Sequence, residues 1–238
     1  MGIPDDRFWA HFLGVDPADW MTPGVSVAPH VGLRGYRGFW CFRRGQTIVV
    51  SAPEPWVERL NQITAECHAD DLLLPQFWLR ALPGDFERAV GPAFQGCLDP
   101  TKFKARSTAA VRLVRDADAL ALDEFRAACS SDWNMPDDAR LWRHAYFEDG
   151  IITALAAYRN WSDSAGDPCV ITRPDGRGCR RGSAVTSAVV AAALSHERLL
   201  LYQTLESNLP AVQIALSLGY ERYANHLAIR LCRESPET

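Results

Sequence analysis

One stretch decides the fold predicted for this chain: Pro174-Asp175-Gly176-Arg177-Gly178-Cys179-Arg180-Arg181-Gly182-Ser183-Ala184. A short apolar strand is predicted before it, at residues 169–172, and a helix of small residues after it, at residues 183–194. Glycines let a backbone approach a ligand closely, and a helix N-terminus carries unpaired N–H groups that attract anions. Arginine adds donors that fit phosphate oxygens. The pattern fits an anion-binding loop, and it equally fits a tight turn with a solvated basic edge.

The composition is that of an ordinary globular protein, since 47% of the 238 residues are hydrophobic and 23% are charged. The net charge of −4 argues against broad binding to nucleic acid or to membranes, so the arginines above are a local feature. Seven cysteines without a CxxC pair fit reduced thiols, and they predict neither a disulfide framework nor a metal site. Without a long apolar run or a basic leader, we expect a cytoplasmic protein.

The first half of the chain predicts secondary structure but carries no chemical motif. Apolar spacing predicts helices over residues 5–13 and 54–67. Two apolar runs at 38–43 and 46–51, joined by Arg44-Gly45, predict a β-hairpin. We expect an α/β domain over residues 1–104 and a second domain over residues 107–238.

The second half predicts alternating strands and helices. A helix is expected over 116–129, and a short helix that opens at Met135 is expected to carry Leu141, Trp142 and Ala145. The remaining expected elements are a hairpin turning at 148–150, a loop at 161–167, a strand at 199–203, a helix at 209–218 and strand structure over 221–231. This order predicts a mixed sheet with helices packed on it, an α/β (α+β) fold.

Two common phosphate-binding motifs fit poorly. A P-loop requires a lysine after its last glycine, and Ser183 follows Gly182 instead. The dinucleotide pattern G-x-G-x-x-G begins at Gly176 and Gly178 but meets Arg181 at its third glycine. Because Glu206 ends the next strand and could bind a ribose, a dinucleotide-binding oxidoreductase stays as a third alternative.

A closer match joins two segments of the second half. Residues 170–185 resemble the acetyl-CoA loop of the GCN5-related N-acetyltransferase (GNAT) superfamily, written R/Q-x-x-G-x-G/A. Residues 206–220 resemble a second motif of that superfamily, in which an asparagine follows a strand and a helix closes in leucine-glycine-aromatic. The resemblance covers about residues 107–231. It implies a GNAT-like acyl-CoA N-acyltransferase fold with an additional N-terminal α/β domain. An alternative interpretation makes that N-terminal domain a degenerate copy of the same fold.

The resemblance implies that the pyrophosphate of coenzyme A lies on the loop backbone and that the pantetheine pairs with the preceding strand. In one register Arg177 takes the R/Q position, Arg180 the first glycine and Gly182 the second. In the other register Cys179, Gly182 and Ala184 take these places. The implied cofactor-binding residues are Val170, Ile171, Thr172, Arg177, Gly178, Cys179, Arg180, Arg181, Gly182, Ser183 and Asn208. Asn208 is also suited to cap the helix that follows it.

The proton-handling groups are less well defined. Family members often carry a tyrosine at the position that Ala215 occupies here. The candidate catalytic residues are therefore Glu148, Tyr202 and Glu206, each of which also fits an ordinary structural role. The expected function is transfer of an acetyl group from acetyl-CoA, as co-substrate, to an amine of a small molecule or peptide. A coenzyme A-binding scaffold that has lost turnover is the second alternative, and a homodimer stays open.

Overall fold

The computed structural model describes residues 4–133, 135 and 141–232, which form ten strands and seven α-helices in a mixed α/β fold. The chain divides into two compact units. The first unit comprises Met1–Gln95, Gln203–Asn208 and Arg222–Thr238, and the second comprises Gly96–Tyr202 and Leu209–Glu221. The units interleave along the chain, and separate domains at 1–104 and 107–238 stay a prediction.

The first unit is built on a mixed sheet with the strand order β1-β3-β2-β10-β4. Its elements are α1 (Pro4–Leu13), α2 (Pro17–Trp20), β1 (Gly24–Pro29), β2 (Gly38–Arg44), β3 (Thr47–Ala52), α3 (Val57–Ala65), α4 (Pro75–Ala81), β4 (Phe86–Cys97) and β10 (Glu221–Leu231). The predicted hairpin is confirmed as the antiparallel pair β2–β3, and β10 pairs antiparallel with the other edge of β2. β1 runs parallel to β3.

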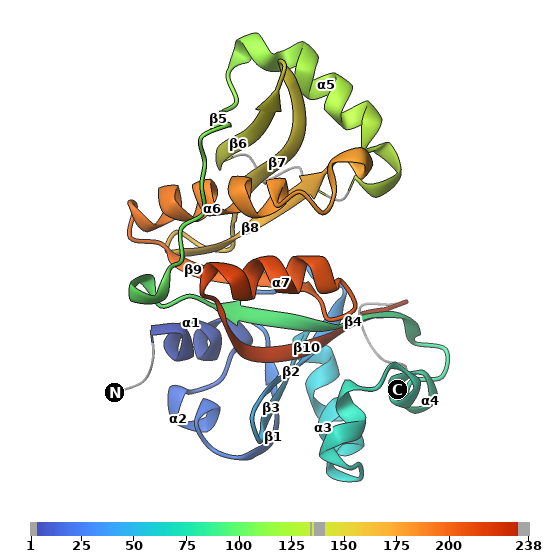
Figure 1. Ribbon diagram of the computed structural model, residues 1–238. Coiled ribbons are helices and arrows are strands. Elements are labelled where there is room, and N and C mark those ends of the chain that lie inside the picture. Colours follow the sequence, from blue (N-terminus) through green and yellow to red (C-terminus); the bar gives the residue numbers. More distant parts are fainter. Residues whose placement is uncertain (1–3, 134, 136–140, 233–238) are drawn as a thin grey trace. The chain divides into compact units, whose positions relative to one another are not determined.

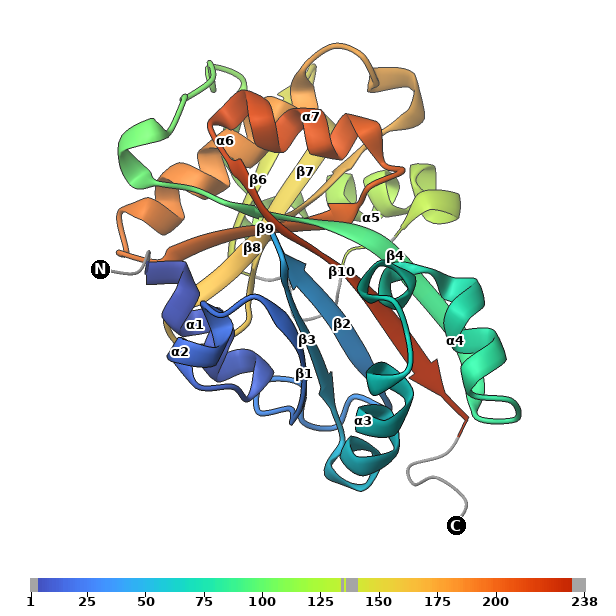
Figure 2. The same cartoon turned by 90° about the horizontal axis from the view of Figure 1, so that it is seen from below.

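Alternating residues of β2 serve the two faces of this sheet, as the period of a strand requires. Phe39 and Cys41 belong to the core cluster formed with α3 and α4. Trp40 and Phe42 face the aromatic residues of α1 and α2, where the rings of Trp9 and Phe42 lie 4.4 Å apart. Figures 1 and 2 show α1 and α2 on one side of β1–β3 and α3 on the other.

The second unit has the strand order β9-β8-β7-β6-β5. Its elements are β5 (Val111–Leu113), α5 (Ala119–Ala128), β6 (Leu141–Glu148), β7 (Ile151–Asn160), β8 (Ala165–Thr172), α6 (Arg181–Leu194), β9 (Leu199–Leu205) and α7 (Leu209–Leu218). The last three residues of β9, 203–205, belong to the first unit. β5 to β8 are antiparallel neighbours, and β9 runs parallel to β8. α5 and α6 lie on opposite faces of these strands (Figures 1 and 2). α5 buries Leu122 and Phe125 against β7 and β8.

Two predictions for this unit are wrong. Leu141, Trp142 and Ala145 lie on strand β6 and not on a helix, while residues 136–140 lie outside the described part of the chain. Trp142 has φ 46°, and the register of β6 on β7 shifts between Leu141 and His144. Such a bulge breaks the two-residue alternation that identifies a strand. The predicted loop at 161–167 is also too long, because β8 begins at Ala165.

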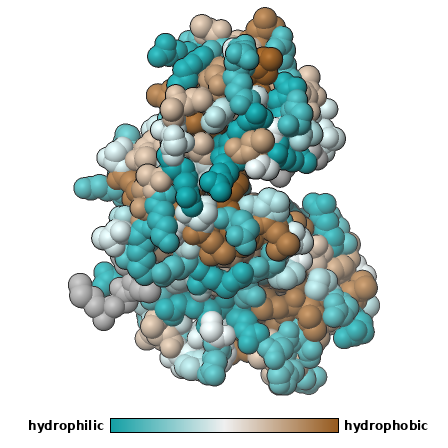
Figure 3. Space-filling model, viewed as in Figure 1, coloured by the Kyte–Doolittle hydropathy of each residue, from teal (hydrophilic) through white to brown (hydrophobic). Residues whose placement is uncertain are grey.

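The helices predicted at residues 183–194 and 209–218 are confirmed as α6 and α7. α7 ends as predicted at Gly219, which has φ +99°. The N–H of Tyr220 donates to the carbonyl of Ala215 at 3.1 Å, which satisfies an otherwise unpaired carbonyl of the last turn. α7 exposes Leu209 and Leu216, and apolar atoms gather over this helix in Figure 3. Within the described residues no helix combines the length and the hydrophobicity needed to span a membrane.

Candidate functional site

The loop between β8 and α6 is fastened to the β6–β7 hairpin at its start. The N–H of Arg173 donates to the carbonyl of Thr153 at 3.0 Å, and the N–H of Gly176 donates to the carbonyl of Arg173 at 2.9 Å. The Arg173 guanidinium also pairs with the carboxylate of Asp175 at 3.0 Å. The loop then turns through Gly178, which has φ +80° and lies exposed. The predicted glycine-rich loop is therefore an ordered turn that delivers the chain to α6.

Arg180 precedes α6 in a left-handed conformation, with φ 60° and ψ 10°. For a residue with a Cβ atom this conformation costs about 1 kcal/mol relative to glycine. Arg180 is the first glycine position in the register that begins at Arg177. In the other register that position is Gly182, which lies inside α6 without a positive φ. The two registers therefore differ in backbone conformation at their first glycine position, with a positive φ only at Arg180.

Gly182 has a packing role of its own in the first turn of α6. A Cβ atom on Gly182 would lie 2.9 Å from the Thr172 hydroxyl oxygen and 3.3 Å from Cδ1 of Ile214. The absence of a side chain thus lets the start of α6 approach β8 and α7 closely. The unpaired N–H groups of this first turn carry a partial positive charge that favours an anion.

β8 and β9 separate six residues before this loop begins. Their parallel pairing covers only Ala165 with Leu199 and Gly166 with Leu200, whereas β8 continues to Thr172. Hydrogen-bonded and non-hydrogen-bonded pairs alternate in an antiparallel ladder. Since Arg173 donates to Thr153 in the β7–β8 ladder, the backbone groups of Val170 and Thr172 point away from β7. We call the point where the pairing ends, after Gly166 and Leu200, the fork.

Ile171 differs from its two neighbours. The same alternation turns its backbone groups toward β7, and its buried side chain packs in the core under α5. Of the three predicted strand residues, Val170 and Thr172 are therefore the two that present N–H and C=O groups at the edge facing the departing β9.

Glu148, a predicted catalytic residue, lies at the end of β6 and pairs with Arg181. The Arg181 guanidinium contacts both carboxylate oxygens, at 2.7 and 2.8 Å, and the two side chains are 18% and 39% exposed. A Cβ atom on Gly176 would lie 2.5 Å from the same guanidinium. The ion pair connects the first residue of α6 to the β6–β7 hairpin across the loop. The geometry therefore gives Glu148 a structural role in holding the loop.

The other two predicted catalytic residues are Tyr202 and Glu206. Tyr202 is buried on β9, and burial raises the pKa of its hydroxyl far above the ordinary value, so the group stays protonated. Glu206 belongs to the first unit, where its carboxylate pairs with Arg222. Glu148 and Tyr202 thus belong to the second unit and Glu206 to the first.

The second predicted motif is confirmed in its helix. Asn208 directly precedes α7, is exposed, and donates its backbone N–H to the carbonyl of Leu205 at 3.0 Å. Ala215, at the position where the resembling family often has tyrosine, is fully buried. A proton donor from that point of α7 is thus excluded by the residue type.

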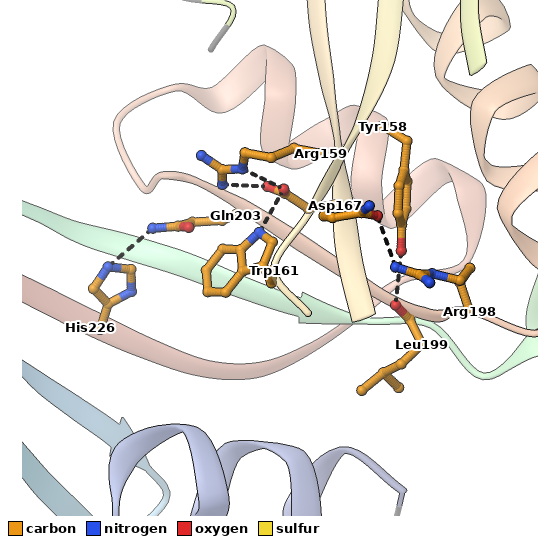
Figure 4. A network of polar contacts seen from close by, with 9 residues as sticks. Tyr158, Arg159, Trp161, Asp167, Arg198, Leu199, Gln203 and His226 are labelled. Carbon is orange, nitrogen blue, oxygen red and sulfur yellow. Dashed lines mark hydrogen bonds and ion pairs between the residues drawn. The ribbon is translucent and has the colours of Figure 1, made fainter. Parts of the chain in front are cut away.

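A buried polar cluster near the fork was missed at the level of sequence. Asp167 is 2% exposed and accepts hydrogen bonds from the Arg159 guanidinium at 3.0 and 3.1 Å and from the Trp161 indole at 2.8 Å (Figure 4). Tyr158 donates to the carbonyl of Leu199 at 3.3 Å, and burial raises its pKa to about 12. The predicted loop hid this cluster, because the pairing of Arg159 with Asp167 follows only from a strand there.

The side chains described above are donors and acceptors of hydrogen bonds. Among the residues that the structure describes, no three histidine, cysteine, aspartate or glutamate side chains gather in a way that would hold a metal ion.

The sequence matches no protein-family model and no curated protein. In three dimensions the chain is similar to a GNAT-family protein from Novosphingobium aromaticivorans, with 19% identity, 66% of this chain and 69% of that chain covered, and a TM-score of 0.51. A GNAT-family acetyltransferase from Colwellia psychrerythraea matches with 12% identity, 65% and 61% coverage, and a TM-score of 0.50. A third, yncA from Salmonella typhimurium, was solved with its cofactor acetyl-CoA and matches at 14% identity, 54% and 96% coverage, and a TM-score of 0.39.

Identities this low establish a likeness of fold. The chain has a GNAT-like fold over about two thirds of its length, and it spans 69% and 61% of the first two similar chains. The sequence resemblance and the likeness in three dimensions point to the same fold.

Proposed function

We propose that this chain is an acyl-CoA-dependent N-acyltransferase that takes acetyl-CoA as co-substrate and acetylates an amine of a small molecule or peptide. One observation carries the proposal: in a GNAT-like fold, the pairing of β8 with β9 ends at the fork, so that β9 leaves the edge of β8 unpaired from there to the loop that opens α6. A strand edge with unpaired amide groups next to an anion-binding helix start suits a ligand with amides and phosphates.

The binding mode follows from the chemistry of coenzyme A. Its pyrophosphate accepts hydrogen bonds from the N–H groups at the start of α6, where the helix dipole adds a favourable field. Its pantetheine amides pair with Val170 and Thr172 as an added strand does. Glu148 and Arg181 hold the loop in place for both contacts.

The reaction is aminolysis of a thioester. The amine nitrogen attacks the acetyl carbonyl, the C–N bond forms, the C–S bond breaks, and the electron pair leaves with sulfur. The amine gives up one proton and the thiolate gains one, so the products are an amide and a free thiol. With Glu148 and Glu206 both paired to arginine, catalysis rests mainly on positioning the two reactants.

A coenzyme A-binding scaffold without turnover is the second candidate function. The buried Ala215 and the arginine-paired carboxylates favour it, because each removes a group that could handle a proton. A dinucleotide-binding oxidoreductase is the third, and it requires that NADP⁺ bind in preference to coenzyme A.

Calorimetric titration of the purified chain distinguishes these functions. We expect saturable binding of acetyl-CoA and of coenzyme A, with NADP⁺ weaker, and release of free thiol from acetyl-CoA in the presence of a panel of amines. Binding without thiol release from any amine supports the scaffold. Absence of acetyl-CoA binding at millimolar concentration contradicts the proposal.

A further inference from the structure

The guanidinium of Arg180 is a charge that the described fold does not use. The side chain is exposed, and none of the described residues forms an ion pair or a hydrogen bond with its guanidinium. Its backbone, with φ 60° and ψ 10°, would also be more stable with glycine at this position. The fold therefore contains no polar contact that accounts for an arginine here.

Two other arginines of the same loop are engaged by carboxylates. Arg173 pairs with Asp175 at 3.0 Å, and Arg181 pairs with Glu148 at 2.7 Å. Because each of these guanidinium groups faces an acid, the two pairs bring little net charge to a ligand. Arg180 keeps its positive charge at the residue directly before α6, and all five residues belong to the second unit.

Coenzyme A carries phosphate in two places, and this step rests on the proposed function. Its pyrophosphate is assigned to the N–H groups at the start of α6, which are neutral donors with a helix dipole worth about half an elementary charge. Its adenosine 3′-phosphate is a monoester with a charge of about −1.5 to −2 at pH 7. That second phosphate lies on the ribose, beyond the N–H groups, so its recognition requires a charged side chain.

The reach of an arginine matches the spacing of these phosphates. Ordinary bond lengths place the guanidinium of an extended arginine about 6 Å from its Cα atom. The same bond lengths separate the 3′-phosphate of a nucleotide from its 5′-phosphate by about 6 to 7 Å. A guanidinium that starts beside the pyrophosphate site can therefore contact the 3′-phosphate.

We propose that Arg180 binds the adenosine 3′-phosphate of coenzyme A and makes the chain selective for acyl donors that carry this group. The planar guanidinium donates two parallel N–H···O bonds to phosphate oxygens. A backbone conformation that glycine would relieve is then retained for the sake of the ligand. Arg180 is on this account a specificity-determining residue for the donor, with no part in the transfer step.

Calorimetric titration with coenzyme A and with 3′-dephospho-coenzyme A tests the assignment. The wild type should bind coenzyme A about tenfold more tightly than the dephospho form, as one charge-assisted contact at an exposed site provides. Arg180→Gly should bind both ligands with Kd values within about twofold of each other and leave the Kd of the dephospho form unchanged. Since this variant relieves the backbone, a lost selectivity cannot be ascribed to unfolding. Arg180→Lys keeps the charge and should retain part of the selectivity.

Arg173→Gln is the matched control, because it removes a positive charge of the same loop that already faces Asp175. The ratio of the two Kd values should stay at its wild-type value in this variant. Equal Kd values for the two ligands in the wild type overturn the inference and leave the proposed function standing. Equal weakening of both ligands by Arg180→Gly also overturns it, because the arginine then acts on the pyrophosphate or on the loop. If neither ligand binds the wild type, the proposed function fails and the inference fails with it.

Discussion

Two strand pairs differ in how far their backbone N–H and C=O groups are paired within the sheet. In the first unit, β10 pairs with β2 over six residues, from Asn225 with Arg43 to Arg230 with Gly38. In the second unit, β9 pairs with β8 over two residues and then leaves it. A fully paired strand contributes to stability, whereas a strand edge that the fold leaves unpaired beside a helix start is available to a ligand.

Two buried polar side chains, one in each unit, differ in their hydrogen bonding. His226 on β10 lies within 3.2 Å of the Gln203 amide (Figure 4). It also lies within 2.9 Å of the Gln95 amide and stacks on Trp40 with ring centres 4.2 Å apart. Both ring nitrogens of this histidine have partners, while the Tyr220 hydroxyl has none among the described residues.

The largest effect is expected at Gly182. In Gly182→Glu the new side chain collides with Thr172 and Ile214 and adds a negative charge at the proposed phosphate site. We expect acetyl-CoA binding to weaken by about 100-fold or more, equivalent to about 2.8 kcal/mol. Ala191→Glu adds the same charge at an exposed position of α6 and should leave Kd unchanged. Equal calorimetric Kd values in the two variants would break the contrast between the units.

Acid should destabilise the first unit through His226. Burial lowers the pKa of His226 to about 3, so below its unfolded value of about 6.5 the unfolded chain takes up a proton that the folded chain does not. This histidine then makes the free energy of unfolding fall by up to about 1.4 kcal/mol per pH unit between pH 6.5 and about 3. Urea denaturation at pH 6.5 and 5 measures the slope. His226→Gln should unfold more easily but with a smaller slope, and an unchanged slope contradicts the assignment.

A smaller effect is expected from the ion pair between Glu148 and Arg181, which holds the loop before α6. Glu148→Gln should weaken acetyl-CoA binding about tenfold, about 1.4 kcal/mol, because the first residue of α6 loses its ionic partner. Asp175→Asn disrupts the more exposed pair with Arg173 in the same loop and should change Kd by no more than about twofold. Under saturating acetyl-CoA, the rate of thiol release in Glu148→Gln should match the wild type. A lost rate with an unchanged Kd would make Glu148 a catalytic base instead.

The smallest effect is expected at Arg180. Arg180→Gly relieves a left-handed backbone and should raise the free energy of unfolding by about 1 kcal/mol. Gly178→Ala introduces a Cβ atom at φ +80° with no neighbouring atom within 4 Å, so it should lower stability by a similar amount through the backbone alone. Chemical denaturation that shows the same sign for both variants contradicts the left-handed geometry of the loop.

The sequence predicts local structure well and tertiary partners poorly. The bounds of α7 were predicted because Gly219 marks its end chemically, and α6 follows a run of small residues. β6 was missed because its bulge at Trp142 breaks the alternation of a strand. The place of β10 in the first unit depends on pairing with β2, which is nearly 200 residues away in sequence. The Glu148–Arg181 pair and the unpartnered Tyr220 hydroxyl likewise arise only when distant segments meet.

Amide hydrogen exchange tests the central claim most directly, because it reports on single backbone groups. On addition of coenzyme A, we predict that exchange at Val170 and Thr172 slows by about tenfold or more, while residues 225–230 of β10 remain unchanged. If coenzyme A binds and the exchange of Val170 and Thr172 stays the same, the edge of β8 at the fork is not the ligand site.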